Sequence, residues 1–305
     1  MINEPSGVDF RQSRSERHSR WCIFTSAGDN NAIDLWVDKA EARRWDLVVA
    51  YYGDDDAEFE RLARLSALAF RVKGSKFQNL KKLVEKMPRF FEQYTHVCVC
   101  DDDIHMSAAQ IDEFFSIAQM FEFWIAQPAF SPGGKWSHEI TIYAGHGVDY
   151  RIVNFVEVTI PIFRRDKLLE FLEVYDGSLV GFGIDFWYMN LFKANEYGRF
   201  AIIDKVQVIN PTDYEKGGRE IDTLQSLDKR LASWAEASKR NGILGFPPKV
   251  FAYCRIASPS DGGKRSVLQI TLGKLRKAQA LLFIAIKQHR SELKRSGQRA
   301  KRLDD

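Results

Sequence analysis

The sequence lacks the features of a membrane-spanning or disulfide-stabilised protein. It holds only four cysteines, and no apolar run approaches the roughly 20 residues that a helix needs to cross a bilayer. The first residues are polar and arginine-bearing, without the apolar core of a secretory signal. The cysteines lie in apolar surroundings without metal-site spacing, which favours free thiols in a reducing compartment. We therefore expect a cytoplasmic protein.

The chain also lacks a strong excess of charge of one sign. Its 44 Lys and Arg against 41 Asp and Glu give a formal net charge of +3, which does not predict a nucleic-acid partner. Basic residues gather instead at residues 287–302, which hold seven Lys and Arg and one Glu. Apolar residues among Lys and Arg near the C-terminus could form a basic amphipathic helix that contacts the anionic inner face of a membrane, but the basic residues come mainly after the apolar ones rather than opposite them. The preferred alternative is a helix packed on the rest of the protein, followed by a solvated basic tail.

Apolar segments alternate with helical patterns once the polar, flexible tail of residues 1–20 ends. Continuous apolar strands separated by helices favour a mainly parallel sheet that is covered on both faces. The expected strands are 21–26, 46–52, 68–72, 96–100, 154–163 and 201–210. The expected helices are 77–91, 107–124, 186–192, 224–239 and a further one from 267 onward. The predicted fold class is therefore α/β, with a mixed sheet flanked by helices and a C-terminal loop and helical extension over residues 216–305.

Three consecutive acids, Asp101, Asp102 and Asp103, follow the apolar strand 96–100. Carboxylates at the end of a buried strand are costly unless a cation neutralises them. Strand alternation would place Asp101 and Asp103 on one face and Asp102 on the other. Such a pair can hold a hard divalent cation beside a phosphorylated ligand. The alternative is a solvated acidic turn that caps the next helix.

The segment Lys73-Gly74-Ser75-Lys76 precedes a predicted helix. A helix N-terminus with flanking lysines favours a diphosphate, because its backbone N–H groups are free and its dipole is positive there. The segment is not a Walker A loop, because the second glycine is missing. An ordinary capped turn is the alternative.

The order of these motifs resembles the GT-A class of nucleotide-sugar glycosyltransferases, and more closely the glycosyltransferase-like family called domain of unknown function 707. The segments that carry the resemblance are 49–54, 73–77, 101–104, 126–129, 154–157 and 181–185. The resemblance implies a Rossmann-like GT-A catalytic domain over residues 21–215. It also implies transfer of a sugar from a nucleotide sugar, with UDP preferred, to a glycan or lipid-linked acceptor in bacterial surface polysaccharide synthesis.

The resemblance also implies roles for single residues. Asp101 and Asp103 would hold Mn²⁺ or Mg²⁺, with Asp103 as the direct ligand. Asn210 stands where many GT-A enzymes have a metal-binding His, and its lack of charge leaves a third protein ligand open. The expected donor-binding residues are Ser26, Gly28, Asp54, Lys73, Lys76, Asp101 and Asp102.

Two further carboxylates are candidates for the catalytic step. Asp185 follows the turn Gly181-Phe182-Gly183 and begins a helix, so it could accept the proton of an acceptor hydroxyl, which implies inversion at the anomeric carbon. Its alternative role is a helix N-cap. Glu157 lies in an apolar segment and could bind sugar hydroxyls or act as base. Its alternative is a solvent-facing strand residue paired with Arg164 or Arg165.

Two other functions stay open from the sequence. A nucleotidyltransferase also uses paired aspartates and metals, but a long lysine-rich helix separates Gly74-Ser75 from Asp101 here. A non-catalytic carbohydrate-binding protein on a transferase fold is the other alternative, and the intact acids Asp101, Asp103 and Asp185 argue against it.

Overall fold

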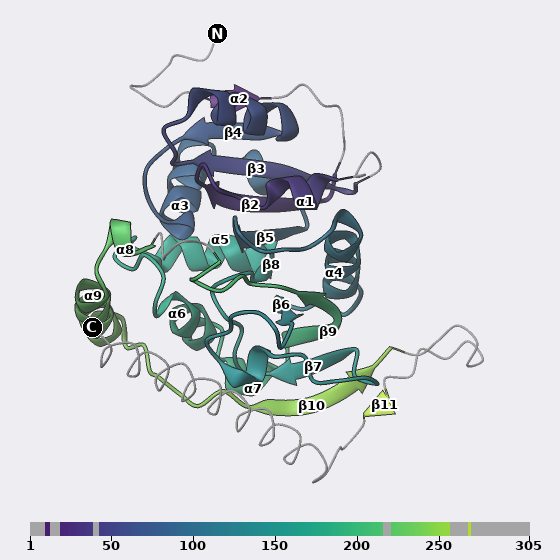
Figure 1. Cartoon of the computed structure of the whole chain (residues 1–305). Coiled ribbons are helices and arrows are strands. Elements are labelled where there is room, and N and C mark those ends of the chain that lie inside the picture. The colour runs from purple at the N-terminus through teal and green to yellow at the C-terminus, as the bar shows by residue number, and fades with distance from the viewer. Residues whose placement is uncertain (1–9, 13–18, 39–42, 216–220, 257–267, 270–305) are drawn as a thin grey trace, which may run out of the picture.

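A computed structural model describes residues 10–12, 19–38, 43–215, 221–256 and 268–269. The strands are β1 (Phe10–Gln12), β2 (Trp21–Ala27), β3 (Trp45–Tyr51), β4 (Leu68–Arg71), β5 (His96–Asp101), β6 (Ile125–Phe130), β7 (Tyr150–Val153), β8 (Ile162–Arg164), β9 (Phe200–Val208), β10 (Val250–Arg255) and β11 (Leu268–Gln269). Within this part of the chain they form one sheet in the order β1-β4-β3-β2-β5-β8-β6-β9-β7-β10-β11 (Figure 1).

Helices flank the sheet and connect its strands. The α-helices are α1 (Ile33–Val37), α2 (Asp56–Leu65), α3 (Lys76–Lys86), α4 (Ala108–Met120), α5 (Arg165–Val174), α6 (Ile184–Leu191), α7 (Ala194–Tyr197), α8 (Ile221–Leu224) and α9 (Leu227–Asn241). Two short 3₁₀ helices are η1 (Phe90–Gln93) and η2 (Glu139–Thr141). The predicted α/β class, with a mixed sheet flanked by helices, is confirmed.

Strands β4, β3, β2 and β5 form a parallel part of the sheet, and β1 pairs antiparallel with β4 at its edge. β2 pairs in parallel with both β3 and β5, and β3 pairs in parallel with β4. Ser26 lies opposite Asp101 in this register, and Ala27 lies opposite Tyr51. The carboxyl ends of β2, β3 and β5 therefore meet at one edge, where open α/β sheets bind ligands.

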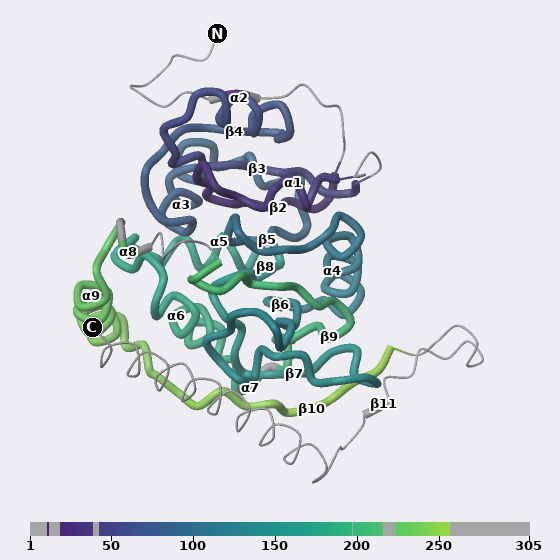
Figure 2. The backbone as a smooth tube through the Cα atoms, in the orientation of Figure 1, coloured from purple at the N-terminus to yellow at the C-terminus, as the bar shows by residue number. Residues whose placement is uncertain are grey.

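The second half of the sheet is mixed. β8 pairs antiparallel with β5 and β6, β9 pairs in parallel with β6, and β7 pairs antiparallel with β9 and β10. The sheet therefore continues through β10, a segment that the sequence placed in the C-terminal extension. Figure 2 shows the chain running from α9 to β10 along this edge.

The strand predicted at residues 154–163 is wrong for most of its length. β7 ends at Val153, β8 begins at Ile162, and the residues between them are irregular. The backbone there is satisfied by side chains, since the N–H of Glu157 donates to the side chain of Gln127. Apolar composition alone cannot distinguish such a buried irregular segment from a strand.

Two apolar clusters cover the two faces of the sheet. One contains residues of α1, α2 and α4, including Trp36, Phe59 and Phe114. The other contains residues of α3, α5 and α6, including Phe77 and Phe171. Figure 1 shows α4 on one side of the sheet and α3, α5 and α6 on the other.

The helix predicted over residues 77–91 ends earlier than expected. α3 ends at Lys86, two residues before Pro88, because a proline disfavours helical backbone in the residue before it. The helix predicted from residue 267 is represented only by Leu268–Gln269, which form β11. The rest of that segment, with the basic tail 287–302, lies outside the described residues. None of the helices in the described ranges is long and apolar enough to cross a membrane.

Candidate functional site

Asp102 ties the loop after β5 to the loop after β2. Its Oδ2 accepts a hydrogen bond of 2.9 Å from the N–H of Gly28, and its carbonyl accepts one of 2.7 Å from Ala32. Gly28 has no space for a larger residue, since a Cβ there would lie 2.8 Å from the Tyr52 side chain. Both Asp102 and Gly28, predicted to bind the donor, thus shape the edge of the sheet through their contact with each other.

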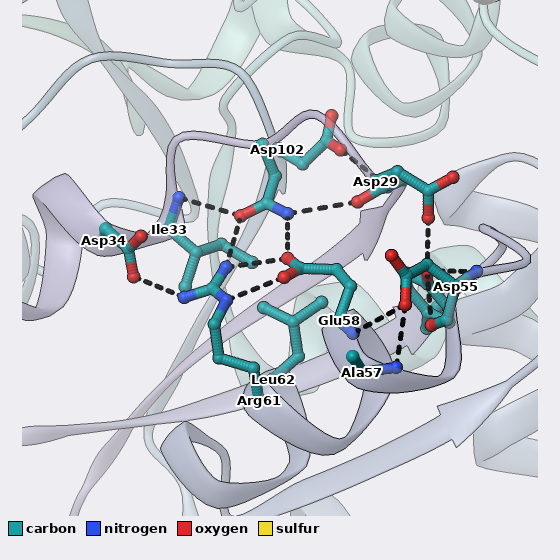
Figure 3. A network of polar contacts seen from close by, with 12 residues as sticks. Asp29, Ile33, Asp34, Asp55, Ala57, Glu58, Arg61, Leu62 and Asp102 are labelled. Atoms are coloured by element: carbon teal, nitrogen blue, oxygen red, sulfur yellow. Dashed lines mark hydrogen bonds and ion pairs between the residues drawn. The ribbon is translucent and has the colours of Figure 1, made fainter.

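An acidic network lines the loops after β2 and β3 (Figure 3). The Tyr51 hydroxyl donates to Asp29 and to the carbonyl of Asp55, and burial together with Asp29 raises the pKa of Tyr51. Arg61 contacts Glu58 through two hydrogen bonds of 2.7 Å, which hold the pKa of Glu58 below its usual range. Arg61 therefore compensates part of the negative charge of this network.

Lys76 lies against the aspartate triplet. Its Nζ is 2.6 Å from Asp101 Oδ1 and donates a 2.7 Å hydrogen bond to the Thr159 carbonyl. That same carbonyl accepts the N–H of Asp101 at 2.9 Å. The Lys76 side chain is 9% exposed and that of Asp101 is 44% exposed. Lys76 is thus a buried counter-ion of Asp101, and the sequence pattern did not pair these two residues.

Glu157 and Asp185 are two buried carboxylates, and the charge of the first acts on the second. Glu157 is 3% exposed, and its Oε1 accepts a 2.8 Å hydrogen bond from the Thr159 hydroxyl. Asp185 is 5% exposed, and its Oδ1 accepts a 2.9 Å hydrogen bond from the N–H of Phe186. Burial raises the pKa of Glu157, and burial with the nearby negative charge of Glu157 raises the pKa of Asp185 to about 7. Both carboxyl groups therefore bind a proton more tightly than an exposed carboxyl group does.

The alternative role of Glu157 as a solvent-facing strand residue is wrong. Its side chain is buried, and Arg164 instead pairs with Asp166 at 2.5 Å. The Arg165 side chain donates to the Glu92 carbonyl. The N-cap position before α6 is Gly183, so Asp185 is not the N-cap residue of its helix.

Asp204 is a buried carboxylate whose negative charge is neutralised by an arginine. Asp204 accepts 2.8 Å and 3.0 Å hydrogen bonds from Arg151, whose side chain is also buried. Within the described residues, neither Glu157 nor Asp185 has such an ion pair with a lysine or arginine. Burying carboxylates without a cation costs folding free energy. A buried carboxyl group with a pKa as strongly raised as that of Asp185 is typical of functional sites.

The remaining donor-binding candidates surround the same edge. Asp54 and Lys73 are exposed and form a 2.7 Å ion pair, and Lys73 lowers the pKa of Asp54. Ser26 is buried, and its hydroxyl accepts a 3.0 Å hydrogen bond from Asn79 of α3. At this edge of the sheet, the Asp54 and Lys73 side chains are therefore accessible to solvent, whereas Ser26 is covered by the surrounding residues.

The metal-site candidates lie on neighbouring segments of the chain. β5 ends at Asp101, and Asp103 lies in the turn that follows. The alternation of side chains along a strand therefore does not determine which face Asp103 points to. An antiparallel bridge between His105 and Ile209 holds the segment of Asn210 against the one that follows Asp103. No group of three His, Cys, Asp or Glu in the described ranges could hold a metal. Mg²⁺ needs only one or two carboxylates when substrate phosphates supply the other ligands, which Asp101 and Asp103 allow.

Sequence reasoning missed several residues of this region. Thr159 joins Lys76 to Glu157 through its carbonyl and its hydroxyl, and no sequence motif marks it. Arg61 could have been paired with Glu58, since residues three apart on a helix are neighbours.

No protein-family model matches this chain, and no curated protein matches its sequence. Solved structures with a similar arrangement include S. aureus TarS 1–349, with 11% identity and a TM-score of 0.48 over 73% of this chain and 74% of that chain. The same TarS segment in complex with UDP has 10% identity and a TM-score of 0.45 over 72% of each chain. GalNAc-T7 with UDP, GalNAc and Mn²⁺ has 9% identity and a TM-score of 0.49 over 72% of this chain and 48% of that chain. This chain thus spans about half the length of the GalNAc-T7 chain.

Proposed function

We propose that this chain is a metal-dependent glycosyltransferase that moves a sugar from a nucleotide-sugar donor to a saccharide or lipid-linked acceptor. The observation that carries the proposal is the chain of contacts from Asp101 through Lys76 and Thr159 to Glu157, whose negative charge raises the pKa of Asp185. It relates an exposed carboxylate, suited to a cation and a diphosphate, to two buried carboxylates with raised pKa values.

The donor would lie at the carboxyl ends of β2, β3 and β5. Ser26, Gly28 and Asp54 surround the place for the nucleoside, and UDP is the first nucleotide to test. Mn²⁺ or Mg²⁺ held by Asp101 and Asp103 would stabilise the negative charge of the departing diphosphate when bound. Lys73 and Lys76 compensate the negative charges of Asp54 and Asp101 at the same edge, which lowers the repulsion that a phosphorylated ligand meets there.

Asp185 takes the proton of the acceptor hydroxyl in this proposal. The hydroxyl oxygen attacks the anomeric carbon, the bond to the diphosphate breaks, and its electron pair leaves with the diphosphate. A pKa of about 7 suits a general base that works near neutral pH. The negative charge of Glu157 increases the proton affinity of Asp185. Direct attack of this kind inverts the anomeric configuration.

A thermal-shift experiment with UDP tests the donor and metal part of the proposal. UDP with Mn²⁺ should raise the melting temperature more than UDP with EDTA, since a ligand at about 100 times its Kd stabilises the folded state by about 2.7 kcal/mol. Asp103→Ala should abolish the metal-dependent part of the shift. Asp228→Ala, at an exposed position in the first turn of α9, is the matched control and should keep it. Equal shifts with Mn²⁺ and with EDTA would refute the metal site.

A further inference from the structure

A row of aromatic rings runs past the backbone of Asp185. Phe182 and Trp234 have ring centroids 5.8 Å apart, and Trp234 and Phe186 also lie 5.8 Å apart. Phe186 contacts Phe155 at 5.4 Å, and Phe155 contacts His138 at 4.4 Å. Because Phe182 and Phe186 both lie within three residues of Asp185 along the chain, the row places an exposed aromatic ring, that of Phe182, near the segment that carries this carboxylate.

Trp234 reaches this row from α9, which is distant in sequence. Its ring lies on the backbone of Gly183, where an added Cβ would be 2.1 Å from Trp234 Cε3. Gly183 also has a φ of 92°, a conformation that favours glycine. Figure 2 shows α9 beside α6 at this place. Helix α9 thus covers the turn that directly precedes Asp185.

The outer end of the row is open to a ligand. Phe182 is 44% exposed, and Trp234 is half-buried. The indole N–H of Trp234 makes no hydrogen bond within the described part of the chain, so it can still donate one. A ligand for this place needs an apolar face for the rings and an oxygen for the N–H. Sugar rings have both, because their C–H groups carry partial positive charge against the negative face of an aromatic ring.

From this geometry we infer that Phe182 and Trp234 bind the acceptor sugar that adjoins the reacting one. The inference rests on the proposed function and narrows its acceptor to the end of an oligosaccharide. The alternative occupant is a lipid chain, which would also contact Leu231, one turn before Trp234 on α9 and 44% exposed. A sugar bound on the exposed faces of Phe182 and Trp234 does not need Leu231, so the substitution of Leu231 distinguishes the two occupants.

Fluorine NMR of protein labelled with 5-fluorotryptophan tests the inference directly. The Trp234 signal is assigned by its loss in Trp234→Phe, and the probes are maltotriose, cellotriose and chitotriose. At least one trisaccharide should shift the Trp234 signal. Phe182→Ala should then raise the Kd of that trisaccharide about tenfold, which corresponds to about 1.4 kcal/mol. Leu231→Ala should leave the Kd unchanged.

Three outcomes overturn the inference. The first is that none of the three trisaccharides shifts the Trp234 signal. The second is that Phe182→Ala leaves the Kd unchanged. The third is that Leu231→Ala weakens binding as much as Phe182→Ala does. UDP binding with Mn²⁺ is measured on the same samples. If UDP binds and the sugars do not, only the acceptor inference fails; if the sugars bind and UDP does not, the transferase proposal fails and the sugar site stands.

Discussion

The substitution Asp185→Asn tests the buried carboxylate pair through both stability and activity. The structure raises the pKa of Asp185 from its ordinary value of 3.8 to about 7, mainly through burial and secondly through Glu157. The folded protein therefore keeps a proton that the unfolded chain releases, so the free energy of unfolding falls as the pH rises from about 4 to 7. At 1.36 kcal/mol per pKa unit, this loss reaches about 4 kcal/mol above pH 7.

Asparagine keeps the shape of the side chain but carries no charge. Asp185→Asn should therefore be more stable than the original protein at pH 8, by up to about 4 kcal/mol, and its advantage should shrink toward pH 5. The same substitution removes the proposed base, so it should abolish sugar transfer while UDP and Mn²⁺ still bind. The protein would thus gain stability and lose activity, as expected when an active site has a stability cost.

Urea unfolding at pH 5, 6, 7 and 8 measures the stability part, with Asp228→Asn as an exposed control. Transfer and UDP binding are measured on the same preparations. A variant that is less stable than the original protein at pH 8, or whose stability difference does not change with pH, would refute the reasoning on the buried charge. Full transfer by Asp185→Asn would exclude it as the base.

Two other substitutions test the ion pairs around the site. Lys76→Met should lower the free energy of unfolding by about 1.5 to 3 kcal/mol, because the charged hydrogen bonds to Asp101 and to the Thr159 carbonyl are lost. An unchanged midpoint of urea unfolding would contradict this prediction. Arg151→Met should lower the free energy of unfolding by about 3 to 5 kcal/mol, because it leaves Asp204 buried without its cation. A decrease below about 1 kcal/mol in the same urea assay would show that this ion pair contributes little to stability.

The parallel half of the fold follows from local pattern. Apolar runs at β2, β3 and β5, separated by helical segments, predict parallel strands whose carboxyl ends meet. The aspartate triplet was placed at this edge for that reason. The pattern failed between β7 and β8, where Glu157 is buried without belonging to a strand, because side chains such as Gln127 satisfy the backbone there.

The amino-acid pattern by itself determined the α/β class and the acidic residues at the carboxyl ends of the parallel strands. Both follow from strand and helix periodicity and from turn residues, which depend on only a few neighbouring positions. Only the tertiary structure decided that Lys76 neutralises Asp101, that Glu157 raises the pKa of Asp185, and that Trp234 lies on Gly183. These three contacts join segments that are distant along the chain. Their energies depend on burial and on separations of a few ångströms, which no local pattern contains.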